Sequence, residues 1–256
     1  MALRTTIPRV DWSQSINKGL VAWWPMWEGA GGKILDISGK SNHGTLTNGP
    51  VWVDGLKFDG TDDYVGGFTV SNFDSITNEV TFAATVQTPS PLATRMDLIQ
   101  RSVGADSWWF NLQSGLVSFY ADNVTGGAYK QSLSPITSDK TNIAVVYNGS
   151  TIKFFINGRL DNTIGATGTL STGSTSLFMA SNNGGLGFYN GILYNLRMWS
   201  RGLIDSEAQR LHINPHAGLY IPDIARYYLP AAGGSSIVPD KGNPMLVTPG
   251  KMMMRG

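Results

Sequence analysis

The chain has 256 residues, no cysteine and a formal net charge of +1. The lack of cysteine excludes disulfides, thiolate metal sites and a cysteine nucleophile, and the near-neutral charge argues against a nucleic-acid-binding protein, which needs a basic face. No run of about 18 apolar residues occurs, so we expect no membrane span, and the opening MALRTTIPRVDW lacks the apolar stretch of a secretory signal peptide.

Turn-forming residues dominate the composition. The chain contains 31 glycines and 12 prolines but only three glutamates, Glu28, Glu79 and Glu207, although glutamate is common in helices. Hydrophobic residues make up 41% of the chain, which is ample for a packed core. The composition therefore predicts a folded, all-β protein.

Short apolar or alternating runs separated by turn residues predict the strands, and their regular spacing is typical of an antiparallel sandwich or jelly roll. Turn residues between neighbouring runs, such as Asn148–Ser150, predict hairpins. Alternation places Trp23 and Trp24 on opposite faces, so we expect one to be buried and the other exposed. In chain order the predicted strands are Leu20–Trp24, Leu56–Phe58, Tyr64–Val65, Val80–Val86, Trp108–Leu112, Leu116–Ala121, Ile143–Tyr147, Thr151–Ile156, Leu177–Ala180 and Ile192–Trp199.

One short helix is predicted near the end of the strand series. Asp205 or Ser206 is a suitable N-cap, and Asn214–Pro215 ends the helix. We expect Ala208 and Leu211 to face the sandwich. Residues 231–256 are rich in glycine, serine and proline and cannot form a core of their own.

Several segments in order resemble laminin-G-like domains of the concanavalin A-like lectin/glucanase superfamily. VTFAATVQ resembles the central strand of that family, and IAVVYNGSTIKFFINGRL resembles its best-recognised hairpin. GFYNGILYNLRMWSRGLIDSEAQRL resembles its closing strand and short helix. The earlier matching pieces are Gly19–Pro25, Asp36-x-Ser38-Gly39, Asn42-His43-Gly44, Phe58-Asp59-Gly60 and Tyr64-Val65.

The resemblance implies a two-sheet antiparallel jelly-roll sandwich. We therefore expect an N-terminal arm at 1–17, a laminin-G-like jelly roll at 18–212 with its short helix, and an extended C-terminal segment at 213–256 that docks on a partner.

Structural calcium is a further expectation from the resemblance, because laminin-G-like folds often hold Ca²⁺ with aspartate, asparagine and backbone oxygens. The matching positions are Asp36, Asn42, Asp59, Asp62 and Asp63. Against this, the closing strand reads Leu193–Leu196 where the family often has Ile-Asp-Glu-Val, so two acids are missing. The alternative is that these aspartates only form turns. Apart from structural calcium, we expect no required cofactor.

Catalysis is not expected. Glycosidases of this fold use acidic residues at alternate positions of one strand, and a pair of carboxyl groups about 5 Å apart for a retaining mechanism. The three glutamates are widely separated in the sequence, and no Gly-x-Ser-x-Gly motif accompanies the histidines. We interpret His43 as a residue that braces its loop.

Carbohydrate binding requires an exposed aromatic platform beside a few polar groups. Candidates are Trp108, Trp109, Tyr129, Asn182, Asn183 and Tyr189. Alternation buries one of the two tryptophans, and Asn-Gly runs are also ordinary loop residues.

Two functions remain open. In the first, the chain is a non-enzymatic structural protein of a virion, such as a capsid decoration or tail-associated protein, because residues 213–230 resemble the segment that comes after such domains in phage-encoded proteins. It would then assemble in the host-cell cytoplasm with other virion subunits, or with copies of itself, through residues 1–17 and 213–256. In the second, it is a lectin-like adhesion module that binds a surface glycan. Both exclude nucleic acid and membrane as partners.

Overall fold

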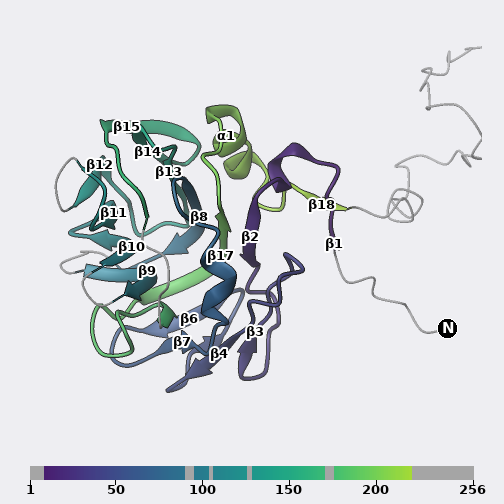
Figure 1. Cartoon of the computed structure of the whole chain (residues 1–256). Helices are drawn as coiled ribbons and strands as arrows, with labels where there is room; N and C mark the ends of the chain where they lie inside the picture. The colour runs from purple at the N-terminus through teal and green to yellow at the C-terminus, as the bar shows by residue number, and fades with distance from the viewer. Residues whose placement is uncertain (1–8, 90–94, 104–105, 126–128, 171–175, 221–256) are drawn as a thin grey trace, which may run out of the picture. The chain divides into compact units, whose positions relative to one another are not determined.

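The computed structural model describes residues 9–89, 95–103, 106–125, 129–170 and 176–220. These residues form two antiparallel sheets packed face to face, as the sequence predicts (Figure 1). Among the described residues, no helix has the length and apolar character needed to cross a bilayer.

The first sheet, called sheet C, has eight strands. In spatial order they are β12 (Lys130–Pro135), β11 (Leu116–Ala121), β10 (Asp106–Gln113), β9 (Arg95–Val103), β16 (Ser176–Met179), β7 (Tyr64–Gly66), β4 (Gly44–Thr47) and β3 (Lys33–Ile34).

The second sheet, sheet B, also has eight strands. Seven follow the order β15 (Arg159–Gly165), β14 (Thr151–Ile156), β13 (Thr141–Tyr147), β8 (Val80–Gln87), β17 (Asn190–Trp199), β6 (Leu56–Asp59) and β5 (Val51–Trp52), and β2 (Leu20–Trp24) pairs with the later half of β17.

The main core lies between the two sheets. Its largest side chains include Trp24, Phe82 and Trp108, all at most 1% exposed. The ring of Phe82 stacks on Phe110, with centroids 5.3 Å apart. Burial of this apolar surface supplies most of the stability of such a sandwich.

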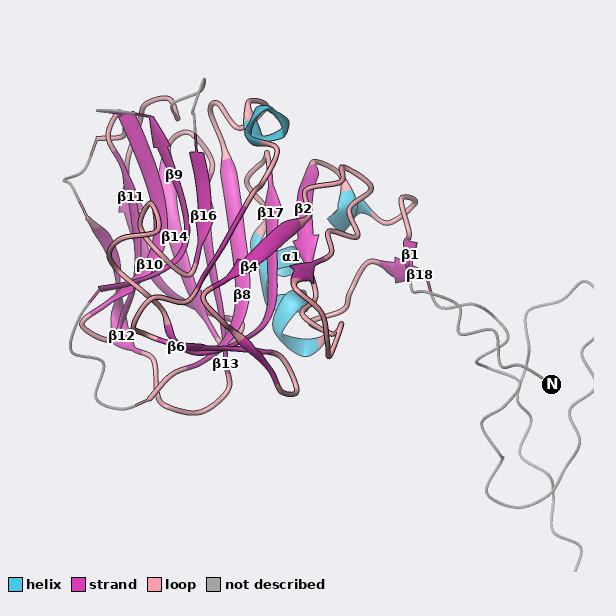
Figure 2. Cartoon of the chain, turned by 90° about the horizontal axis from the view of Figure 1, so that it is seen from below, coloured by secondary structure: helices cyan, strands magenta, loops and turns pink. Residues whose placement is uncertain are grey.

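A second core covers the outer face of sheet B. The helix α1 (Asp205–Ile213) lies on one side of the sheets (Figure 2), contacts β13, and directs Ala208 and Leu211 toward the sheet, as predicted. The 3-10 helix η1 (Ser15–Asn17) contributes Ile16 to the same cluster. A further 3-10 helix, η2, spans Val70–Phe73.

The two cores explain the neighbouring tryptophans of β2. Trp24 enters the main core and Trp23 enters the second core, and both are fully buried. The expectation that one of them is exposed was therefore wrong, because α1 and its neighbours cover the face that Trp23 occupies.

The N-terminus of α1 also differs from the prediction. The N-cap position is Ile204, one residue before the predicted candidates, and the carboxylate of Glu207 accepts a hydrogen bond from the backbone N–H of Ile204. Glutamate at this position supplies half of a capping box, which replaces the expected side-chain cap. The helix ends at Ile213, before Asn214–Pro215 as predicted.

A short ribbon joins the two ends of the described region. The strand β1 (Arg9–Val10) pairs with β18 (Leu219–Tyr220), so that Arg9 lies opposite Tyr220. Buried Asn17 fixes this arrangement by donating to the backbone oxygens of Asp11 and Gly218, at 2.7 and 2.8 Å. Residues 9–17 of the predicted arm and 213–220 of the predicted tail thus contact each other; residues 1–8 and 221–256 lie outside the described residues.

Candidate functional site

Alternation along β10 determines which of its side chains lie on the outward face of sheet C. Trp108 points into the core, whereas Trp109, Asn111 and Gln113 point outward. The adjacent strands continue this face, since Trp109 lies opposite Tyr120 of β11. Polar and aromatic side chains are therefore gathered on one surface of the sheet.

Three rings form what we call the aromatic platform: Trp109, Tyr120 and Tyr129. The rings of Trp109 and Tyr120 stack with centroids 4.1 Å apart, and Tyr129 packs against both at 6.2 and 5.2 Å. Tyr129 is 40% exposed. The hydroxyl of Tyr120 donates to the carboxylate of Asp122, which raises the pKa of Tyr120 to about 12.

Beside the platform, Arg95 and Asp97 form an ion pair. The Nε of Arg95 donates to Oδ1 of Asp97 at 2.8 Å, and the guanidinium lies over the Trp109 ring at 4.2 Å from its centroid. Asn111 donates to the same oxygen of Asp97 at 3.2 Å. Burial raises the pKa of Asp97, although Arg95 and Asn111 oppose that shift.

Unused hydrogen-bonding capacity is concentrated on this face. Each buried donor or acceptor without a partner costs about 1–3 kcal/mol, so native proteins keep few of them. Ligand hydroxyls have the chemistry to complement such a group of donors and acceptors. Within the described part of the chain, the buried atoms of this face without a partner are Arg95 Nη2, Asp97 Oδ2, Gln100 Oε1, Trp109 Nε1, Asn111 Oδ1, Gln113 Oε1 and Ser118 Oγ.

A β-bulge in β9 makes this arrangement possible. Phe110 lies opposite Ile99 whereas Asn111 lies opposite Asp97, so that β9 contains one extra residue. Without the bulge, Asp97 and Gln100 would point to opposite faces, because they are three residues apart. With it, both lie on the outward face.

The loop between β16 and β17 approaches the same face. The backbone N–H of Asp97 donates to the carbonyl of Gly187 at 2.8 Å, and a Cβ at Gly187 would lie 2.2 Å from Oδ2 of Asp97. The predicted residues Asn182 and Asn183 belong to this loop, in which the backbone of Asn182 pairs with that of Leu186. The fold thus brings this loop to the side of the ion pair.

Two of the predicted carbohydrate contacts are core residues in this structure. Trp108 is 1% exposed and packs on Phe82, and Tyr189 is fully buried and packs edge-to-face on Phe58. The Tyr189 hydroxyl donates to the backbone oxygen of Gln87 at 3.2 Å. Neither side chain presents a surface to a ligand, so we correct the predicted set by removing both.

Sequence reasoning missed Arg95, Asp97, Asn111 and Tyr120. Alternation along the predicted strand containing Trp109 would have found Asn111, and the register of its hairpin would have found Tyr120. Arg95 and Asp97 gave no such signal, because the strand β9 contains charged residues and a bulge.

The predicted calcium ligands separate into two groups. The Asp36 carboxylate is saturated, because it accepts hydrogen bonds from the backbone of Trp23, Ser38 and Asn42 and from the hydroxyl of Ser38. His43 braces the same loop as expected, with its Nδ1 accepting the backbone N–H of Asp36 at 3.0 Å.

Asn42 is also committed to the fold. Its side-chain amide donates to the carbonyl of Val21 at 2.9 Å, and its amide oxygen accepts from Asn72 at 2.7 Å. Asp36 and Asn42 therefore hold the loop after β3 together, and they do not fit a cation site.

The carboxylates of Asp59, Asp62 and Asp63 do come together. They lie within 4.8 Å of one another in the turn after β6, with Asp63 buried and the other two exposed. Burial, together with the charges of Asp59 and Asp62, raises the pKa of Asp63. Ca²⁺ takes six to eight oxygen ligands, and these three carboxylates can supply some of them. Asp59, Asp62 and Asp63 are therefore the residues that would hold the ion.

Each of the three glutamates makes a structural contact. Glu28 accepts the backbone N–H of Leu35, Glu79 accepts that of Gly202, and Glu207 pairs with Arg201 through both carboxylate oxygens.

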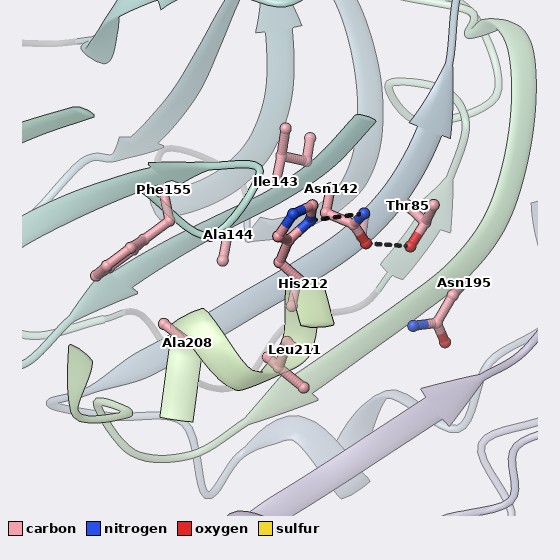
Figure 3. Close-up of a pocket in the computed structure, with 12 residues that line it drawn as sticks. Thr85, Asn142, Ile143, Ala144, Phe155, Asn195, Ala208, Leu211 and His212 are labelled. Carbon is pink, nitrogen blue, oxygen red and sulfur yellow. Dashed lines mark hydrogen bonds between the residues drawn. The ribbon is translucent and has the colours of Figure 1, made fainter. Parts of the chain in front are cut away.

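A small cavity lies beneath α1, between the helix and β8 and β13. Figure 3 shows His212 directed toward Asn142, which in turn accepts a hydrogen bond from Thr85 at 2.9 Å. The cavity has a volume of about 20 Å³, which accommodates roughly one water molecule. It is a packing defect of the second core rather than a ligand site.

Comparison with known families gives one match: a model of the concanavalin A-like lectin/glucanases superfamily fits residues 59–209. A search of curated proteins found no match.

Several solved structures have a similar fold. A sialidase from Trypanosoma rangeli in complex with sialic acid has a TM-score of 0.59 and 14% identity, over 77% of this chain and 33% of the sialidase. The receptor binding domain of botulinum neurotoxin D has a TM-score of 0.58 and 13% identity, over 78% of this chain and 54% of that chain.

A third similar structure is domain 4 of the GH43 extracellular arabinanase AbnA from Geobacillus stearothermophilus, in complex with arabinotriose. Its TM-score is 0.57 at 17% identity, over 75% of this chain and 98% of that domain. The chain spans about a third of the sialidase and about half of the toxin domain. At these identities the similarity shows the fold alone.

Proposed function

Because the chain belongs to the concanavalin A-like lectin/glucanases superfamily, we propose that it is a non-enzymatic carbohydrate-binding module. The observation that carries the proposal is the outward face of sheet C, where the aromatic platform adjoins buried polar atoms that lack partners. Sugars combine flat apolar ring faces with hydroxyls, and this surface offers a complement to both. A domain of similar fold was solved with arabinotriose bound, which supports the proposal by analogy.

The two halves of the surface have different roles in the proposal. Tyr129 is the exposed ring of the platform, and Trp109, like Tyr120, is partly buried. In the proposal, Trp109 and Tyr129 stack on the apolar face of a sugar ring. Neighbouring hydroxyls then interact with the Arg95–Asp97 pair, with Nη2 of Arg95 as donor and Oδ2 of Asp97 as acceptor. Because both atoms are buried, the side chain of Arg95, which is 23% exposed, and the backbone of Gly187, which lies against Oδ2 of Asp97, shift when the ligand binds.

The affinity for one sugar unit is expected to be low. A typical hydrogen bond contributes about 0.5–1.5 kcal/mol net, and an open face immobilises the ligand without enclosing it. The platform extends across β10 and β11 to Tyr129, which directly precedes β12, so an oligosaccharide that contacts the platform through several units binds more tightly than its monomer.

The test is a glycan array with the full chain, followed by titration of the best ligand. The double variant Trp109→Ala/Tyr129→Ala is expected to lose binding while keeping its thermal midpoint near that of the wild type. Trp12→Ala is the matched control, because Trp12 is 53% exposed and lies outside the platform. Equal binding by the double variant and the wild type would contradict the proposal.

A second proposal is an assembly role as a virion component, in which the same module is displayed on a particle. The β1–β18 ribbon supports it, because residues 1–8 and 221–256 both continue the chain from this ribbon. Two terminal segments that start at one place can engage one neighbouring subunit together.

Sedimentation of a lysate of the source tests the assembly role. The chain is expected to travel with large particles at a fixed stoichiometry, and a variant lacking residues 231–256 is expected to stay folded but leave the particles. Sedimentation of the wild-type chain as a free 27.6 kDa protein would contradict the assembly role and leave the carbohydrate proposal standing.

A further inference from the structure

A second pocket lies against β17 of sheet B, on the side of the sandwich opposite to the aromatic platform. Its volume is about 190 Å³, and its walls include Trp27, Asp54, Lys140, Tyr194 and His216. Drug-sized ligands occupy pockets of about 300–1,000 Å³, so this one has room for a single small ring. We call it the β17 pocket.

An exposed aromatic pair forms one side of the β17 pocket. The indole of Trp27 is 41% exposed and stacks on the imidazole of His216, with centroids 5.8 Å apart and an angle of 26° between the rings. The preceding residue, Met26, has a φ of 53° although its side chain is only 2% exposed. Such a backbone conformation is uncommon for a bulky residue and tends to occur at functional sites. Here it belongs to the turn that leaves Trp27 at the rim.

A lysine is held over another wall of the pocket. The Nζ of Lys140 lies 3.3 Å from the centroid of the Tyr194 ring, and the Tyr194 hydroxyl donates to Oε1 of Gln87 at 2.6 Å. The ring is thereby fixed, and a cation–π contact positions the ammonium group. Within the described residues Lys140 forms no ion pair, so its charge is available to an anion.

A second cation lies behind the pocket. Arg197 is fully buried, lies 3.4 Å over the Trp23 ring, and donates to the backbone oxygens of Pro215 and Ala217. Among the ion pairs of the described residues, none involves this arginine. Burial lowers the pKa of Arg197 from its usual value, but an arginine side chain stays protonated in proteins, so its charge adds to that of Lys140.

The remaining charged groups agree with a positive site. Partial burial, and then the charges of Arg197 and Lys140, lower the pKa of His216, so its ring is neutral at pH 7 and can stack or accept a hydrogen bond. Asp54 is the one carboxylate among the lining residues, and it is exposed to solvent. Lys140 and Asp54 are therefore the lysine and the carboxylate that line the pocket, and the buried Arg197 adds a positive charge behind it.

We propose that the β17 pocket binds a sugar ring that carries a carboxylate, such as a uronic or sialic acid residue. The carboxylate pairs with the Lys140 ammonium, the ring packs against Trp27, and hydroxyls donate to Asp54. The choice of a sugar rests on the proposed function, but the site is separate from the aromatic platform and selects for charge. The module would then hold an acidic residue of a glycan at one face and neutral residues at another.

The experiment is a ¹⁵N NMR titration of the full chain carrying both Trp109→Ala and Tyr129→Ala, which together disable the platform. Glucuronic acid and N-acetylneuraminic acid are the probes, and glucose is the neutral control. We expect at least one acid to shift the indole signal of Trp27 and to bind about tenfold more tightly than glucose, the usual gain from a charge-assisted hydrogen bond.

Variants then test the lysine. Lys140→Gln is expected to weaken binding of the acid about tenfold and to leave glucose unchanged. Lys33→Gln, an exposed lysine on β3, is the matched control and is expected to bind as the parent does. Trp27→Ala is expected to weaken binding of the acid as well.

The proposal is overturned if neither acid binds better than glucose, or if Lys140→Gln and Trp27→Ala both bind the acid as the parent does. Because the platform is disabled throughout, these outcomes leave the proposed function untouched. Conversely, loss of oligosaccharide binding by the platform variant says nothing against the β17 pocket.

Discussion

The two outward faces of the sandwich are built in opposite ways. On sheet B a group of outward side chains is apolar, such as Ala144 and Phe155, and these pack in a second core with side chains of α1 and β2. On sheet C the outward side chains of β9 and β10 are polar, and seven of the face's buried polar atoms lack partners among the described residues.

The difference separates stability from binding. The second core on the outward side of sheet B stabilises the fold through apolar burial. The outward face of sheet C gives up part of that stabilisation, because unpaired buried groups are unfavourable. A surface that keeps such groups beside stacked rings is better suited to a polar ligand than to packing.

The largest effect is expected in the second core. Trp23→Ala removes a fully buried ring and the bond from its Nε1 to Asn195 at 2.8 Å. Loss of a core tryptophan is expected to lower the free energy of unfolding by about 3–5 kcal/mol, as measured by urea denaturation. Trp12→Ala, at an exposed position, should change it by less than about 0.5 kcal/mol. Similar values for both variants would show that the second core contributes little.

The next largest effect is expected on thermal stability in the presence of Ca²⁺. It depends on the carboxylates of Asp59, Asp62 and Asp63, which lie outside both outward faces. If they hold Ca²⁺, a concentration of 100 times the dissociation constant stabilises the fold by about 2.7 kcal/mol. We expect the thermal midpoint to rise with Ca²⁺, to fall with a chelator, and to lose both responses in Asp63→Asn. Asp36→Asn is the control, and it is expected to lower the thermal midpoint but to keep the response to Ca²⁺. Identical melts of the wild type with and without Ca²⁺ would contradict a calcium site.

On the outward face of sheet C, substitution of a platform residue should affect glycan binding more than protein stability. Trp109→Ala removes a platform ring that is only partly buried, and aromatic stacking contributes about 0.5–1.5 kcal/mol beyond area burial. We expect about a tenfold loss of affinity for the best oligosaccharide, measured by calorimetry. Trp12→Ala, at an exposed position outside both proposed sites, should leave this affinity unchanged; equal losses in the two variants would place the site elsewhere.

The smallest expected effect is a pH dependence of stability, which arises from Asp97 on the outward face of sheet C. Because burial raises the pKa of Asp97 above 3.8 in the folded state, the native protein binds more protons than the unfolded chain just above that pH. Stability therefore falls as the pH rises through this window, and the loss is complete above the folded pKa. Asp97→Asn lacks this contribution, so the wild-type midpoint should drop relative to that of the variant as the pH rises above about 4.

The gap between the two midpoints is the quantity to measure, by calorimetry at several pH values. Asp122→Asn is a useful control, because Asp122 lies beside the platform and outside the Arg95 pair. A constant gap between wild type and Asp97→Asn would mean that the carboxylate titrates normally.

Much of the fold could be predicted because its strands follow simple alternation. The strands β2, β11 and β14 begin and end at the predicted residues. The same rule indicated that one of Trp108 and Trp109 is buried, though it could not say which. It failed for Trp23, since alternation in one strand carries no information about what covers each face.

The candidate site was harder to predict for two physical reasons. The bulge in β9 breaks the two-residue period, so that Asp97 and Gln100 share a face that alternation would separate. Asp36 and Asp59 look alike as loop aspartates, but only the structure distinguishes a saturated carboxylate from one of three clustered acids. Both distinctions depend on contacts between segments far apart in the chain.

The indole N–H signals of the eight tryptophans report on both faces in one experiment. A ¹⁵N NMR titration of the wild-type chain with its best oligosaccharide should shift the signal of Trp109, whose Nε1 has no hydrogen-bond partner among the described residues. The signals of Trp23 and Trp12 should stay in place. A titration in which the glycan binds and the Trp109 signal does not move would contradict a carbohydrate site on the outward face of sheet C.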